Sequence, residues 1–239
     1  MSLTNVYEDE TRAEAYAGLG FANTYHLAFR DLPAIFREHV AGKRALDFGC
    51  GTGRSTRFLR AEGFDAVGVD IAPEMIAKAH ALDPEGDYRL VPADDLSGFA
   101  DGSFDLVLCA FPFDNIPGFD TKVDLFRALR RLLAPAGKIV NLVSSPEIYL
   151  HEWASFSTKD FPENRFAKPG DVVRIVTTDF GDRRPCEDIL WPDASYREVY
   201  ARADLKPVAK YEPLAKGDEP YRWISETSVA PWVIYVLAL

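Results

Sequence analysis

Residues 45–54 read ALDFGCGTGR, and the next apolar run, AVGVD at residues 66–70, ends in the carboxylate of Asp70. Three glycines at alternate positions follow the first apolar run, and glycine lets the backbone turn sharply and approach a ligand closely. In an open α/β sheet, an acidic residue at the tip of the neighbouring strand lies in the ligand crevice, where it can accept hydrogen bonds from ribose hydroxyls. The stretch therefore predicts a parallel sheet with a nucleotide-type ligand at its carboxyl edge.

The spacing of the glycines separates two cofactor classes. A dinucleotide fingerprint requires G-x-G-x-x-G/A, in which the third small residue packs the helix against the strand. Counted from Gly49, that third position is Arg54, a bulky cation, which argues against an NAD-dependent oxidoreductase. The pattern Asp47-x-Gly49-x-Gly51-x-Gly53 instead resembles motif I of the class I S-adenosylmethionine (SAM)-dependent methyltransferases. The resemblance implies that SAM is the cofactor and that this turn holds its methionine end.

Further matches extend the resemblance over most of the first 145 residues. Residues 70–76 resemble the family's D-x-S-x-x-M segment, and residues 91–108 resemble a stretch in which an acid contacts the adenine amino group. That role falls on Asp94, with Asp95 as the rival because the alignment requires a one-residue gap. The cofactor-binding residues that the resemblance implies are Asp47, Gly49, Gly51, Gly53, Asp70, Ile71, Met75, Asp94, Asp95, Leu96, Ala110 and Phe111.

The resemblance also implies the fold class. It is an α/β, doubly wound, Rossmann-like sheet of seven strands, mostly parallel with an antiparallel last strand, and a small antiparallel flap is inserted after strand five. The length of 239 residues and the lack of a Ser/Gly-rich linker favour a single methyltransferase domain over residues 1–239. We expect an N-terminal helical lid at 1–42, a SAM-binding core at 43–145, an inserted substrate flap at 146–192, and a closing helix with the last two strands at 193–239.

Local patterns predict further elements. Residues 7–39 and 121–133 have helical character, and the turn at 135–137 leads into a strand at 138–143. Within the flap, residues 171–178 and 187–191 are predicted strands joined by a turn at 181–185. A helix follows at 193–200 with Asp193 as its N-cap, and strands follow at 208–211 and 232–237.

The helix that precedes the glycine-rich turn carries two candidate cofactor contacts. In small-molecule methyltransferases such a helix often lies over the cofactor and supplies a Tyr hydroxyl and an Arg to the methionine carboxylate, and Tyr25 and Arg30 are the candidates here. The alternative is an amphipathic helix in which Tyr25 and Phe29 pack together at i, i+4 while Arg30 faces solvent.

Candidate catalytic residues come from strand four and from the flap. Strand four leads into residues 111–115, FPFDN, which match neither the Asn/Asp-Pro-Pro-Tyr/Phe signature of base and amide methyltransferases nor the His-His pair of several lipid and quinone enzymes. Asn115, with Asp114, is placed to contact the methyl acceptor or to stabilise a turn. His151 is the candidate general base, because a neutral amine or an aromatic hydroxyl must lose a proton; its alternative role is structural.

Composition limits the partners. The net charge of −10, from 27 basic and 37 acidic residues, opposes attraction to a phosphate backbone, so no nucleic-acid partner is expected. Three arginines, Arg127, Arg130 and Arg131, form either a local basic patch or, as the spacing favours, the solvated face of a helix. We expect no metal, and no membrane association because no apolar run reaches the ~20 residues of a membrane span. Three cysteines, Cys50, Cys109 and Cys186, make a disulfide framework unlikely, so we expect a reducing, cytoplasmic location.

These observations lead to one favoured function. The sequence predicts a SAM-dependent methyltransferase that acts on N or O of a small acceptor, in particular an aromatic or heteroaromatic metabolite. A non-catalytic SAM-binding sensor or regulatory subunit is the alternative, because methyl transfer can proceed without a dedicated base.

Overall fold

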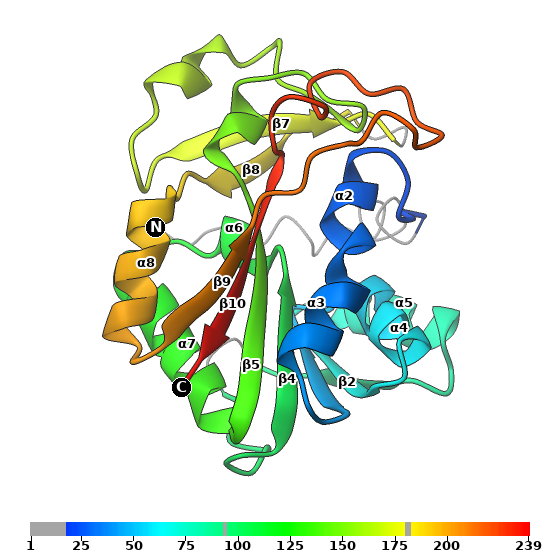
Figure 1. The fold of residues 1–239 in the computed structure, drawn as a ribbon, viewed down its shortest axis with the longest axis vertical. Helices are drawn as coiled ribbons and strands as arrows, with labels where there is room; N and C mark the ends of the chain where they lie inside the picture. The colour runs from blue at the N-terminus through cyan, green and yellow to red at the C-terminus, as the bar shows by residue number, and fades with distance from the viewer. Residues whose placement is uncertain (1–17, 93–94, 180–182) are drawn as a thin grey trace.

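The larger sheet of the computed structural model, which describes residues 18–92, 95–179 and 183–239, has seven strands in the order β3-β2-β1-β4-β5-β10-β9 (Figure 1). Strands β1 to β5 pair in parallel, and β10 is antiparallel to both β5 and β9. This confirms the mostly parallel, doubly wound sheet. The strands are β1 (Arg44–Phe48), β2 (Asp65–Asp70), β3 (Asp87–Leu90), β4 (Phe104–Ala110), β5 (Leu133–Ser144), β9 (Lys206–Tyr211) and β10 (Trp232–Ala238).

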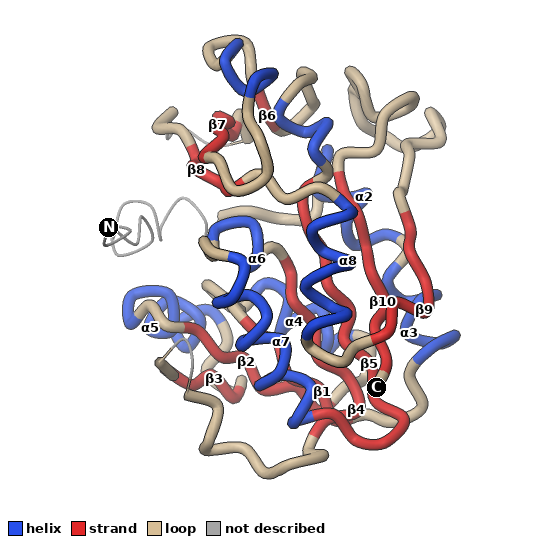
Figure 2. The backbone as a smooth tube through the Cα atoms, turned by 90° about the vertical axis from the view of Figure 1, so that its left-hand side faces the viewer, coloured by secondary structure: helices blue, strands red, loops and turns tan. Residues whose placement is uncertain are grey.

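Helices cover both faces of this sheet, which explains why its central strands are almost continuously apolar. Along β5, Ile139 and Val143 face a core shared with α7 and α8, whereas Val140 and Leu142 face a core shared with α2 and α3. Figure 2 shows α7 and α8 in front of the strands. The helices are α2 (Thr24–Arg30), α3 (Leu32–His39), α4 (Arg54–Ala61), α5 (Pro73–Leu82), α6 (Pro112–Asn115), α7 (Phe119–Leu132) and α8 (Asp193–Arg202).

The flap contains the predicted antiparallel pair and one strand that the sequence did not reveal. β7 (Val172–Thr177) pairs with β8 (Cys186–Ile189), and the two-residue β6 (Phe156–Ser157) pairs with β7. Two 3-10 turns, η1 (Pro146–Tyr149) and η2 (Pro162–Phe166), complete it. The flap lies beyond the carboxyl end of β5 (Figure 1), so it covers the edge at which the ligand is expected.

Three predicted boundaries are wrong. Residues 18–23 precede α2 without being helical, and a break at Asp31 separates α2 from α3, whose second residue, Pro33, lacks the N–H that a continuous helix needs. The predicted stop at 135–137 lies inside β5, where the register with β4 shifts between Phe104 and Leu106. Pro192, not Asp193, is the N-cap of α8, and the Asp193 carboxylate accepts hydrogen bonds from Arg197 and Tyr235 instead.

The flap is anchored to the sheet by a buried tryptophan, which gives a stability prediction. Trp153 is 2% exposed, its indole N–H donates to the Ile148 carbonyl at 2.8 Å, and it belongs to the same core as Leu142 of β5. Trp153→Ala should therefore lower the free energy of unfolding by about 3–5 kcal/mol, measured by urea denaturation. Phe166→Ala, at a site 76% exposed, is the control and should have little effect. A loss below ~1 kcal/mol for Trp153→Ala would contradict this packing.

Candidate functional site

The loop after β1 forms a cradle at the carboxyl edge of the sheet. Gly49, Gly51 and Gly53 all have positive φ, at 74°, 54° and 80°. A Cβ on Gly49 would lie 2.6 Å from the Pro112 side chain, and one on Gly53 would lie 2.6 Å from the Tyr88 ring. A Cβ on Gly51 would meet nothing within 4 Å. Packing therefore explains two of the glycines, whereas Gly51 borders open space in which a ligand can approach the backbone.

Asp70, the last residue of β2, is bonded to this loop. Its Oδ2 accepts the Gly51 N–H at 2.8 Å, and its Oδ1 accepts the Ala72 N–H at 2.9 Å. Burial raises the pKa of this carboxyl. Each carboxylate oxygen can accept a second hydrogen bond, so Asp70 can hold the two hydroxyls of a ribose beside Gly51.

Asp47, inside β1, supplies an unsatisfied acceptor. Its Oδ2 accepts the hydroxyls of Ser55 and Thr56, each at 2.6 Å, but its buried Oδ1 has no hydrogen-bond partner within the described residues. Burial raises the pKa of Asp47 to about 6. A buried carboxylate oxygen without a donor is costly, and the ammonium of a methionine moiety would supply that donor. The residues at this edge therefore fit SAM.

The other predicted cofactor residues have different surroundings. Met75 and Leu96 are buried, whereas Ile71, directly after Asp70, is 49% exposed. Asp94 lies outside the described residues. The Asp95 carboxylate is exposed and accepts hydrogen bonds from the N–H and hydroxyl of Ser97, so it stabilises a local turn.

Ala110 ends β4 and Phe111 follows it, and both are among the predicted cofactor residues. Ala110 and Phe111 are partly buried, and Phe111 adopts a φ of 73° as α6 begins. Its ring lies 4.6 Å from that of Trp232 and 6.3 Å from that of Tyr25, centroid to centroid. Phe156 of the flap lies 5.2 Å from Tyr25. These four residues, here called the aromatic cluster, bring together α2, β4, β10 and the flap.

The two candidates from the N-terminal helix are in different positions. Tyr25 belongs to the aromatic cluster, and the Arg54 guanidinium lies 4.6 Å from its ring centroid. Arg30 forms ion pairs of 2.8 Å with Asp31 and Glu219, so its guanidinium is engaged elsewhere. In the sequence, Arg54 stands out only because it departs from the dinucleotide pattern. In the structure, its guanidinium lies beside the ring of Tyr25.

A buried polar cluster joins α6 to the flap. Asn115 donates to Asp188 Oδ1 at 2.6 Å and to the Glu187 carbonyl at 3.0 Å, and the Tyr149 hydroxyl donates to Asp188 Oδ2 at 3.0 Å. Asp114 accepts the N–H and hydroxyl of Ser144. Sequence reasoning found Asn115 and Asp114 but missed Asp188 and Tyr149, which lie in the flap.

Lys122 completes this polar cluster from α7. It is fully buried, donates to the Phe113 carbonyl, and lies among the rings of Phe113, Trp191 and Tyr196 at 5.2–5.7 Å from their centroids. Burial lowers the pKa of Lys122 and raises that of Asp114, each to about 7. Burial therefore disfavours the charged forms of both groups, which lie in a region shielded from water.

His151 lies apart from these contacts. Its side chain is 40% exposed and its Nε2 lies 3.1 Å from the Glu147 carboxylate, four residues earlier. Its ring also contacts the edge of Trp153. Trp153, in contrast, is buried in the core.

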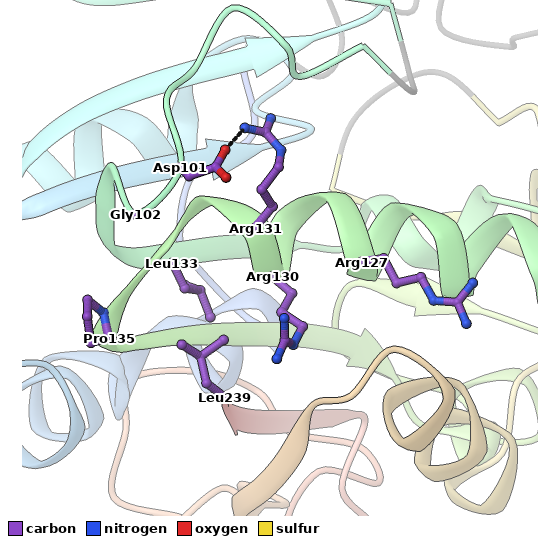
Figure 3. A pocket seen from close by; sticks show the side chains of 8 residues that line it. All are labelled: Asp101, Gly102, Arg127, Arg130, Arg131, Leu133, Pro135 and Leu239. Carbon is purple, nitrogen blue, oxygen red and sulfur yellow. Dashed lines mark hydrogen bonds and ion pairs between the residues drawn. The ribbon is translucent and has the colours of Figure 1, made fainter.

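The three arginines of α7 border a hollow of about 580 Å³ at the opposite, amino-terminal edge of the sheet (Figure 3). Arg131 forms an ion pair with Asp101 and donates to two backbone carbonyls. Arg127 donates to the carbonyl of the last residue of α8, and Arg130 donates to a carbonyl just after that helix. Because these guanidiniums hold neighbouring backbone groups, they serve the packing of α7. Among the described residues, no group of three or more metal-ligating side chains is found, and no helix has the length and apolarity to cross a membrane.

Comparison with known proteins agrees with the geometry of the cradle. Residues 46–141 match the family described as "Methyltransferase domain". The fold resembles an S-adenosylmethionine-dependent methyltransferase from Clostridium acetobutylicum, with a TM-score of 0.65, 15% identity and 94% coverage of both chains. The matched segment, residues 46–141, is therefore similar to the methyltransferase family that the glycine-rich motif resembles. The CcbJ methyltransferase of Streptomyces caelestis shares the fold at a TM-score of 0.60 and 18% identity over 89% of this chain and 95% of that one.

The relatives of this chain differ in how much of it they align with. A ubiquinone biosynthesis O-methyltransferase from Xanthomonas oryzae is 36% identical over 43% of this chain, and the match spans only 44% of that protein. An N-demethylindolmycin N-methyltransferase from Streptomyces griseus is 28% identical over 84% of both chains. The match of residues 46–141 to a methyltransferase family implies SAM as cofactor, in agreement with the cradle around Gly51.

The raised pKa of Asp47 predicts a pH dependence of ligand binding. In the protein without ligand, the Asp47 carboxyl becomes protonated as the pH falls through about 6. A neutral carboxyl cannot form an ion pair with the ammonium of the ligand. The affinity for S-adenosylhomocysteine (SAH) should therefore be constant above this pH and fall by up to about tenfold per pH unit below it. Calorimetric titration across this range measures the effect. Asp47→Asn should bind more weakly at neutral pH and lose the dependence; an unchanged slope in this variant would contradict the role of Asp47.

Proposed function

We propose that this protein transfers the methyl group of SAM to N or O of a small aromatic or heteroaromatic acceptor. One observation carries the proposal: Asp70, the open side of Gly51 and the unsatisfied Oδ1 of Asp47 converge at one edge of the sheet. These groups match, in order, a ribose, a backbone contact and an ammonium. When bound, SAM supplies a methyl group already activated by its sulfonium.

The acceptor is proposed to lie against the aromatic cluster. Rings of Tyr25, Phe111, Phe156 and Trp232 meet where β4 and β10 approach the flap. Aromatic walls bind flat or cationic molecules and keep water from the reacting atoms. Since the methyl group needs no further activation, these residues act mainly by aligning the acceptor and by excluding water.

We propose Asp188, in place of His151, as the group that takes the acceptor's proton. Asp188 is 9% exposed, and its carboxylate is held by Asn115, which follows β4, and by Tyr149 of the flap. His151 is more exposed and pairs with Glu147. A carboxylate fixed between these two elements is better placed for proton transfer than an imidazole near solvent.

The first experiment tests cofactor binding. Wild-type protein should bind SAH in a calorimetric titration, and Asp70→Ala should weaken binding by about ten- to a hundredfold, since charge-assisted hydrogen bonds contribute roughly 1.5–3 kcal/mol. Asp65→Ala, at the exposed start of the same strand, is the matched control and should bind normally. Binding of NAD in preference to SAH would overturn the proposed function.

The second experiment tests the chemistry. Methyl transfer from labelled SAM to a mixture of small aromatic amines and phenols should be lost by about a hundredfold in Asp188→Asn, whereas SAH affinity should stay within about threefold. Glu187→Gln changes the neighbouring, exposed carboxylate and should remain active, as should His151→Ala. Loss of activity in His151→Ala with full activity in Asp188→Asn would reverse the assignment. SAH binding without any transfer would favour a non-catalytic SAM-binding protein.

A further inference from the structure

Glu226 is a buried carboxylate in the segment between β9 and β10 that the cofactor motif does not include. It has no measurable exposure. Its Oε1 accepts the Thr24 hydroxyl at 2.6 Å and the Ala154 N–H at 2.7 Å. Its Oε2 accepts the N–H groups of Ile224 at 2.8 Å and Ser225 at 3.1 Å. One carboxylate therefore ties together the start of α2, the flap and the segment before β10.

Thr24 is the point at which these segments meet. Its N–H donates to the Ser155 hydroxyl at 3.1 Å, and its own hydroxyl oxygen accepts the Ser155 N–H at 2.9 Å. Its carbonyl accepts the indole N–H of Trp232 at 2.8 Å. Because its N–H, carbonyl and hydroxyl are all used, the backbone at the start of α2 is held in one position.

The next residue, Tyr25, has a hydroxyl that none of the described residues engages. The residue is 7% exposed, and within the described residues its hydroxyl makes no hydrogen bond. The Arg54 guanidinium of α4 lies 4.6 Å from the centroid of the Tyr25 ring. A phenol hydroxyl is a hydrogen-bond donor, so it can donate to a ligand that accepts a hydrogen bond.

We propose that Glu226 is a positioning residue: through Thr24 it fixes the Tyr25 hydroxyl so that it donates a hydrogen bond to the carboxylate of the methionine moiety of bound SAM. This inference rests on the proposed SAM binding. A carboxylate suits the place, because a hydroxyl donor and the Arg54 guanidinium lie together there. Glu226 makes no contact with the ligand itself in this arrangement and acts through α2.

The test compares two ligands that differ in that carboxylate. SAH carries the amino-acid group, and 5′-methylthioadenosine lacks it. Glu226→Gln removes acceptor capacity from a carboxylate that receives four hydrogen bonds, and Thr24→Val removes the hydroxyl. Both variants should weaken SAH by about tenfold in calorimetric titrations while 5′-methylthioadenosine affinity stays within about twofold. Tyr25→Phe should show the same selective loss.

Two controls separate positioning from general damage. Thr24→Ser keeps the hydroxyl that Thr24→Val removes, so it should bind SAH as the wild type does. Glu219→Gln changes a carboxylate of the same segment that pairs with Arg30, and it should show no selective loss of SAH affinity. The double variant Tyr25→Phe/Glu226→Gln should be no weaker than Tyr25→Phe alone, because both changes remove one interaction.

Several outcomes would overturn the inference. Equal weakening of SAH and 5′-methylthioadenosine would make Glu226 a purely structural residue, and so would additive losses in the double variant. Unchanged SAH affinity in Glu226→Gln would also reject it. Wild-type protein that does not bind SAH would instead contradict the proposed function from which the inference starts.

Discussion

The hydrogen bond from the Gly51 N–H to the Asp70 carboxylate is the interaction on which the site depends. It links the turn after β1 to the tip of β2, two strands that already pair in register from Arg44 to Phe48. The loop is thereby fixed in a left-handed conformation that glycine adopts without strain. Everything proposed for cofactor recognition, from the ribose contact to the ammonium contact at Asp47, requires this loop to stay where the two strands hold it.

The parts of the fold that could be predicted are those set by local sequence. The alternate glycines, the acid that ends β2 and the apolar period of the strands each depend on a few neighbouring residues, and the structure confirms the sheet that they predict. Helix α7 was also found, because its apolar and charged faces alternate at the helical period. The short strand β6 carries no such signal, since two residues have no period.

The parts that could not be predicted depend on contacts between distant segments. Lys122 has the residue type of a solvent-facing helix position, and only the rings around it show that it is buried. Asp193 fits the N-cap preference, but a partner on β10, Tyr235, holds its carboxylate. The same holds for Asp188, whose partner Asn115 lies 73 residues earlier. Local patterns cannot reveal such pairs, because their partners are chosen by the fold.

The bond between the Trp232 indole and the Thr24 carbonyl also constrains how the protein reaches its native state. Its two residues are separated by 208 positions, and the Glu226 carboxylate spans almost the same interval to Thr24. Contacts this far apart require most of the loop-closure entropy to be lost before they form. During synthesis, the polar groups of Thr24 cannot all be satisfied until Glu226 and Trp232, more than 200 residues later, have been made. The position of α2 over the site therefore depends on the pairing of β10 with β5, because Trp232 is the first residue of β10.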